Sequence, residues 1–260
     1  MSEIHPSAIV DPGADLGAGC KVGPFAVIGP QVVLGPRCEI KPHAVVTGDT
    51  HLGEGCTVFP GAVVGEVPQD LKYRGEPTRL RIGAHNTIRE GATLNLGTAG
   101  GGGVTRVGDG NLFMTGAHIG HDAQVGSGCV FANQAAIAGH CEIGDDVIVG
   151  GLSGVHQWVR VGRGAIVGAV TMVTNDVVPY GLVQGPRGDL DGLNIVGLKR
   201  RGAARSDIFA LRAAYAMLKQ GEGSFMERAR RLSEETDSPM VRELTAFILA
   251  DTDRHFLVPK

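Results

Sequence analysis

The residues best suited to acid–base chemistry gather in one short stretch of the chain, at His118, His121, His140 and His156. Imidazole exchanges a proton near neutral pH, so a histidine can act as a general base and then as a general acid. Asp122 follows His121 directly, and its carboxylate could fix the tautomer of that ring and raise its basicity. Any one of these histidines alone would be an ordinary surface residue, but together they form a candidate site for proton transfer.

A six-residue repeat must position these side chains. Aliphatic residues fall at every sixth position from Ile4 to Val64, and the spacing returns from Val107 to Val173 with Phe at two positions. Mostly small residues form a second series, four positions after the first. A period of six is typical of parallel β-helices of hexapeptide repeats, whose units bury their apolar residues by stacking. Residues i and i−2 of a strand face the same way, so both series are predicted to point into the core.

The cysteines indicate how many repeats make one coil. Three full repeats separate Cys20 from Cys38 and Cys38 from Cys56, which predicts a triangular coil. Successive coils would rise by about 4.8 Å, the spacing of strands in a sheet. Every cysteine belongs to the small inward series, so we predict buried free thiols rather than a disulfide or metal framework at Cys20, Cys38, Cys56, Cys129 and Cys141.

The same stacking predicts which candidate catalytic groups meet. Gly139 follows His121 by three full repeats, and His140 follows Asp122 by the same interval. Because glycine has no Cβ, its N–H can approach a reacting group closely, and such a donor can stabilise an oxyanion. We therefore expect the N–H of Gly139 to lie beside the imidazole of His121.

Two intervals interrupt the repeat, and a helical pattern follows it. Residues 65–79 are rich in proline and charge, and residues 95–106 contain a run of glycine; both are expected to leave the β-helix as loops. From Ser206 the spacing becomes helical and ends at Gly221, Ser224 with Glu227 forms a capping box, and a last helix is expected from Ser238 to Leu249. We expect a β-helix over residues 1–190 and a helical domain over residues 191–260.

Composition limits the classes of protein to consider. The chain has 260 residues, of which 41 are Gly and 5% are aromatic, which suits a narrow repetitive core. A formal net charge of −3 gives no reason to expect a nucleic-acid partner. The first residues lack the pattern of a secretory signal, and no apolar run approaches the length of a membrane span. These features favour a cytoplasmic protein that does not span a membrane.

Several segments together resemble a known family. They are GEVPQDLKYRGEPT at residues 65–78, AHIGHD at 117–122, AGH at 138–140, VHQ at 155–157 and NIVGLKRRG at 194–202. These segments look like those of the UDP-N-acetylglucosamine acyltransferases, which perform the first acylation of lipid A biosynthesis. The resemblance covers nearly the whole chain, and it implies a left-handed parallel β-helix with a C-terminal α-helical domain and a homotrimer with three clefts. It also implies a 3-hydroxyacyl donor on the phosphopantetheine of acyl carrier protein, with no bound cofactor.

The resemblance further implies a role for each matching residue. His121 would be the general base at the 3-position of a UDP-sugar, Asp122 would orient it, and the N–H of Gly139 would receive the oxyanion. The substrate-binding residues would be Asp70 and Lys72 at the glucosamine, His118, His140, His156 and Gln157 along the cleft, Asn194 near the uridine, and Arg200 and Arg201 at the diphosphate. The basic group Lys199, Arg200, Arg201, Arg205 and Arg212 would also bind the acidic acyl carrier protein.

Four positions depart from the family pattern. Asn95 and Leu96 stand where relatives carry His and a basic residue near the acceptor, and we expect Asn95 to be a substrate-binding residue as well. The acceptor atom could therefore be the oxygen of a 3-hydroxyl sugar or the nitrogen of a 3-amino sugar. Val196 replaces a residue that can be acidic near the base. Ala169 replaces a glycine in the region that measures the acyl chain, and we expect a preferred length of roughly ten to fourteen carbons, since each methylene contributes only about 0.8 kcal/mol.

Other functions remain open from the sequence. A coenzyme-A-dependent acetyltransferase would share the repeat. Histidines between subunits could hold zinc, as in a carbonic-anhydrase-like enzyme, although we expect no metal here. A purely structural solenoid would make His121 dispensable. An N-acyltransferase of a later lipid A step would be expected to carry an additional N-terminal domain.

Overall fold

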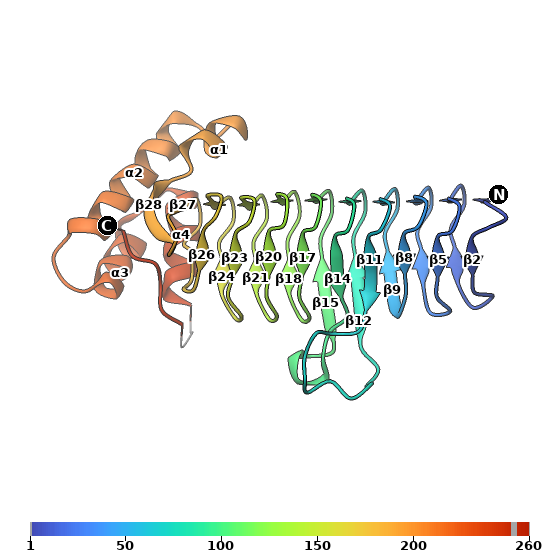
Figure 1. Ribbon diagram of the computed structural model, residues 1–260. Coiled ribbons are helices and arrows are strands. Elements are labelled where there is room, and N and C mark those ends of the chain that lie inside the picture. The colour runs from blue at the N-terminus through green and yellow to red at the C-terminus, as the bar shows by residue number, and fades with distance from the viewer. Residues whose placement is uncertain (1, 251–253, 260) are drawn as a thin grey trace.

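Short parallel strands wind into a long triangular prism, and helices gather at its C-terminal end (Figure 1). The structure is a computed structural model that describes residues 2–250 and 254–259. Positions 1, 251–253 and 260 of the two expected domains lie outside the described residues. The strands form three sheets, one on each side of the prism, which we name A, B and C.

Along the prism each sheet takes one strand from each coil, so its neighbouring strands are far apart in the chain; only the last two strands of sheet A, among the described residues, follow each other directly and pair antiparallel. Sheet A contains β1 (Glu3–Ile4), β4 (Lys21–Val22), β7 (Glu39–Ile40), β10 (Thr57–Val58), β13 (Thr87–Ile88), β16 (Leu112–Phe113), β19 (Val130–Phe131), β22 (Ile148–Val149), β25 (Ile166–Val167), β27 (Gly181–Gln184) and β28 (Asp189–Leu193). Sheet B contains β2 (Ile9–Val10), β5 (Val27–Ile28), β8 (Val45–Val46), β11 (Val63–Glu66), β14 (Thr93–Asn95), β17 (His118–Ile119), β20 (Ala136–Ile137), β23 (Gly154–Val155) and β26 (Met172–Val173). Sheet C contains β3 (Asp15–Leu16), β6 (Val33–Leu34), β9 (Asp49–Leu52), β12 (Arg79–Ile82), β15 (Val104–Val107), β18 (Gln124–Val125), β21 (Glu142–Ile143) and β24 (Arg160–Val161).

The register between coils confirms the predicted stacking. Glu3 pairs with Lys21 and Lys21 with Glu39, so each step spans three full repeats. The step is longer only where a loop is inserted, as between Thr57 and Thr87. Like positions therefore lie above one another along each side of the prism.

Both inward series form the core, as predicted. The aliphatic residues are buried from Val22 onward through Val173, and the rings of Phe113 and Phe131 stack with their centroids 5.0 Å apart. All five cysteines are buried and free, which confirms that prediction. Because each thiol lies inside the stack, the cysteines contribute to packing rather than to a cross-link.

Two loops leave the prism at the same corner (Figure 1). We call the turns that join a sheet B strand to the next sheet C strand the B–C corner. The first loop connects β11 to β12, and the second connects β14 to β15 and includes the short 3-10 helix η1 (Ala99–Gly101). The strands beside each loop are longer than the sequence predicts and reach into residues 65–79 and 95–106. Backbone pairing continues there after the side-chain repeat has stopped, since Arg79 pairs with Asp49 and Glu66 pairs with Asn95.

Within residues 2–250 and 254–259, four helices follow the prism: α1 (Ile195–Arg200), α2 (Arg205–Gln220), α3 (Phe225–Glu235) and α4 (Pro239–Leu249). The predicted capping box of Ser224 and Glu227 is present, Gly221 ends α2, and Ser238 precedes α4. The sequence did not predict α1. The expected domain boundary at residue 190 falls within β28 and stays a prediction. Among the described residues, no helix has the length and apolar character needed to cross a membrane.

Candidate active site

The B–C corner carries the main candidate residues, one coil above another. Asp122, His140 and Trp158 occupy the same turn position in successive coils, and each has a left-handed backbone with φ of 61°, 61° and 68°. Backbone hydrogen bonds hold the coils together here, from His140 N to His121 O (2.9 Å) and from Trp158 N to Gly139 O (3.2 Å). The predicted stacking of His140 over Asp122 is therefore present.

Asp122 is a buried carboxylate with several hydrogen-bond donors. Its exposed fraction is 3%. Oδ1 accepts from the backbone N–H of Thr98 (2.7 Å), and Oδ2 accepts from the hydroxyl of Thr98 (2.6 Å) and from Nδ1 of His121 (2.8 Å). The backbone N–H of Asp122 donates to Oγ1 of Thr105 (2.7 Å). These bonds offset the cost of burying the carboxylate and fix its direction.

His121 has the arrangement of a general base. With the carboxylate of Asp122 as acceptor, Nδ1 carries the proton, so Nε2 presents a lone pair. The ring lies against Gly139, where a Cβ would be 2.5 Å from Cε1 and 2.6 Å from Nε2 of His121. Position 139 therefore requires glycine, because any larger residue would place its Cβ in the space that the His121 ring occupies. Within the described part of the chain, the N–H of Gly139 donates to no acceptor, so this donor is free beside the imidazole.

His140 and His118 lie beside this pair. The rings of His140 and His121 meet edge to face with centroids 4.9 Å apart, and Nδ1 of His140 is 3.7 Å from Oδ2 of Asp122. Burial lowers the pKa of His140, and Asp122 opposes the effect. On β17, Nδ1 of His118 lies 2.8 Å from Oγ1 of Thr93; burial lowers the pKa of His118, and His121 adds to the shift. Both imidazoles are therefore favoured in the neutral form.

The first loop brings Asp70 and Lys72 toward the histidines. The backbone N–H of Lys72 donates to Oδ1 of Asp70 (2.9 Å). That hydrogen bond is the main cause of the lowered pKa of Asp70, and the charge of Lys72 and the protonated forms of His121 and His140 lower it further. Asp70 and Lys72 also act on the pKa of His140. The loop thus adds one charge of each sign to the site.

Asn95 joins the two loops. Its side-chain N–H group donates to the carbonyls of Glu66 (3.3 Å) and Val67 (3.2 Å), and its Oδ1 is buried without a partner among the described residues. His156 and Gln157 are exposed, one coil beyond His140, with Nδ1 of His156 3.2 Å from the carbonyl of Gln157.

Asn194, Arg200 and Arg201 belong to a different corner of the prism, where sheet C strands connect to sheet A. Asn194 caps α1 by accepting from the N–H of Gly197, and it donates to the carbonyl of Gly164 (2.9 Å). Arg201 also donates to Gly164 (3.4 Å), and Arg200 is exposed at the end of α1. Within one chain, these residues do not lie at the B–C corner with His121.

Sequence reasoning missed Thr98, Thr105 and Trp158. The signal for the threonines was the glycine run of the second loop, which lets the backbone close around Asp122. A Cβ at Gly101 would lie 2.1 Å from Cγ of Asp122, and one at Gly97 would lie 2.8 Å from Oδ1. Trp158 stacks on His140 with centroids 3.8 Å apart, but the six-residue series gives no sign of this contact.

Metal ligation fits this corner less well than proton transfer. Ligand atoms of His121, Asp122 and His140 all lie within 4.8 Å of one another. The carboxylate of Asp122, however, already accepts bonds from Thr98 and His121. A cation would have to displace these donors, so the arrangement is better suited to orienting an imidazole.

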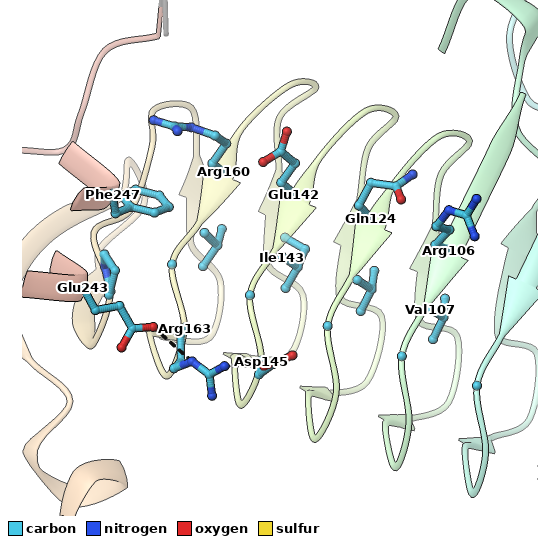
Figure 2. A pocket seen from close by; sticks show the side chains of 18 of the residues that line it. Arg106, Val107, Gln124, Glu142, Ile143, Asp145, Arg160, Arg163, Glu243 and Phe247 are labelled. Carbon is cyan, nitrogen blue, oxygen red and sulfur yellow. Dashed lines mark hydrogen bonds and ion pairs between the residues drawn. The ribbon is translucent and has the colours of Figure 1, made fainter. Parts of the chain in front are cut away.

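A wide groove of about 940 Å³ lies on the outer face of sheet C and contains none of the predicted catalytic residues. Figure 2 shows Arg106, Gln124, Glu142 and Arg160 following one another along its strands. Charged residues that line the groove form ion pairs with one another: Arg163 contacts Asp145 (2.5 Å) and Glu243 (3.0 Å). Sheet C thus presents a charged outer surface, and the histidines lie at its edge.

Proteins of known sequence define the class to which this fold and site belong. Residues 13–48 match the family model of the bacterial transferase hexapeptide (six repeats), and residues 176–256 match that of UDP N-acetylglucosamine O-acyltransferase, domain 2. The chain is therefore a hexapeptide-repeat acyltransferase.

Individual relatives identify the family. An acyl-(acyl-carrier-protein)–UDP-N-acetylglucosamine O-acyltransferase of Paracoccus denitrificans is 62% identical over 196 residues, which cover 75% of this chain and 74% of the relative. One from an Anaeromyxobacter species, strain K, is 54% identical over 232 residues, covering 89% of this chain and 90% of the relative. The chain belongs to the UDP-N-acetylglucosamine O-acyltransferase family.

Solved structures agree over nearly the whole chain. A crystal structure of a UDP-N-acetylglucosamine acyltransferase is 38% identical with a TM-score of 0.95 and covers 99% of both chains. The Campylobacter jejuni enzyme of the same name is 37% identical with a TM-score of 0.94, covering 99% of this chain and 100% of its own. The predicted fold class, a left-handed parallel β-helix of hexapeptide repeats with C-terminal helices, is confirmed.

Proposed function

We propose that this protein moves a 3-hydroxyacyl chain from acyl carrier protein to the 3-hydroxyl of UDP-N-acetylglucosamine, as the first step of lipid A biosynthesis. Its relatives are named for the same donor and acceptor. The observation that carries the proposal is the 2.8 Å contact between His121 Nδ1 and Asp122 Oδ2, which leaves Nε2 available as a base. A cytoplasmic location follows from the proposed use of acyl carrier protein and a nucleotide sugar.

The proposed reaction needs only groups of the protein. Nε2 of His121 takes the proton of the sugar hydroxyl while the oxygen attacks the thioester carbonyl. The N–H of Gly139 receives the negative oxygen of the tetrahedral intermediate. Collapse of the intermediate breaks the carbon–sulfur bond, and the proton on His121 passes to the departing thiolate of phosphopantetheine. No bound cofactor is required for these steps.

The acceptor is proposed to be an oxygen, in keeping with the O-acyltransferase names of the relatives. Asn95 departs from the family pattern, but its side-chain N–H group donates to the backbone of the first loop. In the same proposal Asp70 and Lys72 bind the glucosamine, while His118, His140, His156 and Gln157 line the cleft. The preferred chain of roughly ten to fourteen carbons is an expectation from Ala169, to be tested by competition between acyl carriers.

A homotrimer would complete the site. In each sheet B strand, the outward residue just before the inward aliphatic one is uncharged: Ile9, Val27, Val45, Val63, Thr93, His118, Ala136, Gly154 and Met172. The later strands of sheet A present Leu112, Val130, Ile148 and Ile166 in the same way. Such a face is suited to burial against a second copy. Packing sheet B of one subunit against sheet A of its neighbour would bring the neighbour's corner with Arg200 and Arg201, and its capping Asn194, toward His121.

The proposed diphosphate and carrier sites share a basic surface. Lys199, Arg200, Arg201, Arg205 and Arg212 are all exposed on α1 and α2 and the turn between them. Arginine forks are suited to phosphate oxygens, and a basic surface attracts an acidic carrier protein.

The test combines purified protein with 3-hydroxyacyl carrier protein and either UDP-N-acetylglucosamine or its 3-amino analogue, with products identified by mass spectrometry. The proposal expects an ester on the first acceptor and its loss in His121→Ala. Transfer from acetyl-coenzyme A alone would favour the acetyltransferase. Faster amide formation would change the acceptor, and no transfer from any donor would reject the proposal.

A further inference from the structure

Trp158 covers one face of His140. The two rings are nearly parallel, with centroids 3.8 Å apart and an angle of 5° between their planes. His121 meets the same imidazole edge to face, at 87°. The ring of His140 therefore has a neighbour on one face and another at its side, which restricts how it can turn.

The position of Trp158 carries a cost that core packing does not explain. Its side chain is outside the inward series and 53% exposed. Its φ of 68° lies in the left-handed region, which is unfavourable for a bulky residue. The hydrogen bond from Trp158 N to Gly139 O maintains this turn and keeps the indole over the imidazole. Because Phe25 and Tyr180 adopt the same left-handed turn, the conformation alone assigns no role, and the observation that links Trp158 to the site is the stacking of its indole on His140.

We propose that Trp158 is a positioning residue, which holds the imidazole of His140 in one plane and keeps water from one of its faces during the acyl transfer. The inference rests on the proposed function. Burial lowers the pKa of His140, so the neutral ring is favoured and can hydrogen-bond a substrate through Nε2. The charged or titratable groups that act on this ring are Asp122, His121, Asp70 and Lys72.

The test compares Trp158→Ala and Trp158→Phe. Removing the ring exposes His140, so its pKa should rise toward the ordinary value, and NMR of the imidazole nitrogens measures this directly. Because the neutral form is needed, the acid limb of the kcat/KM profile should move to higher pH. The lost orientation should lower kcat/KM by about tenfold to a hundredfold. Phenylalanine keeps a stacking ring and should retain both values.

Phe25→Ala is the matched control. Phe25 has a left-handed backbone, is 59% exposed and stacks on His43 with centroids 5.1 Å apart, away from the candidate site. This change should leave the titration of His140 and the pH profile unchanged. If Trp158→Ala fails to fold, Trp158→Leu replaces it, since leucine keeps apolar volume without a ring.

The inference is overturned if the folded variant lacking the ring keeps the wild-type pKa of His140 and the wild-type acid limb. The inference is also contradicted if Trp158→Phe changes the pKa of His140 or the acid limb of the kcat/KM profile. Because the NMR titration requires no substrate, it still decides the role of Trp158 if the wild-type enzyme proves to use a different donor or acceptor.

Discussion

The hydroxyl of Thr98 donates a hydrogen bond to Oδ2 of Asp122, and the same oxygen accepts a hydrogen bond from Nδ1 of His121. A residue of the second loop therefore controls the direction of the carboxylate that orients the proposed base. The glycine run that allows this contact is a part of the site rather than a tolerated insertion.

Thr98→Val should weaken catalysis while leaving the fold intact. Valine has a similar shape but removes a hydrogen bond to a carboxylate, which is worth about 1.5–3 kcal/mol. We expect kcat to fall by roughly tenfold or more, since 1.4 kcal/mol corresponds to a factor of about ten. Thr98→Ser keeps the hydroxyl and should retain most of the activity. Equal rates for the valine and serine variants would contradict this role.

Gly139→Ala should displace His121. The new Cβ would meet the imidazole at 2.5 Å, so the ring must move away from its place beside the backbone N–H. We expect a loss of about a hundredfold in kcat, as for other misplaced catalytic groups. Gly192→Ala is the control, because nothing lies within 4 Å of a Cβ there and its φ needs no glycine. A fully active Gly139→Ala enzyme would rule out this packing.

The free energy of unfolding should fall when the pH is lowered from about 7.5 to about 5.5. Burial lowers the pKa of both His118 and His140 from the ordinary value of 6.5, so the unfolded chain binds more protons than the folded chain in this range. Stability should therefore rise with pH through this range. Urea unfolding of the wild type and of the His118→Asn, His140→Asn double variant measures the effect. The variant should show a weaker pH dependence, and an equal dependence would exclude these two histidines as its source.

The cysteines should resist thiol reagents in the folded protein. Burial raises the pKa of Cys129 and of Cys141 to about 12, so little thiolate exists at neutral pH. A disulfide reagent should react with the thiols only slowly before denaturant is added and rapidly afterwards. Fast reaction of several thiols in the folded enzyme would contradict the buried positions.

The repeat made the prism predictable because each coil obeys the same local rule. The constant step from Cys20 to Cys38 to Cys56 predicts the register, and the register in turn places His140 over Asp122. Helix α3 was predictable for a similar reason, since its capping box is a local pattern.

The remaining parts of the site depend on contacts that no repeat encodes. Thr98 reaches Asp122 through a loop whose length breaks the six-residue rule, so its position could not be counted along the chain. Trp158 reaches His140 through a left-handed turn, which the residue type alone would not predict. Asn194 and Arg201 lie where they do because α1 packs against the turn at Gly164, a contact between segments distant in sequence.

The uniform climb of the prism has a consequence for how the molecule could change its dimensions. Asp122, His140 and Trp158 follow one another at a constant interval of one coil, so adding or deleting one full turn beyond them would shift the terminal helices by about 4.8 Å with little rotation. The span between the proton-transfer corner and the basic end of the molecule is thereby adjustable in fixed increments. Increasing the distance between His121 and the basic surface of α1 and α2 would need the insertion of a whole coil rather than a redesigned surface.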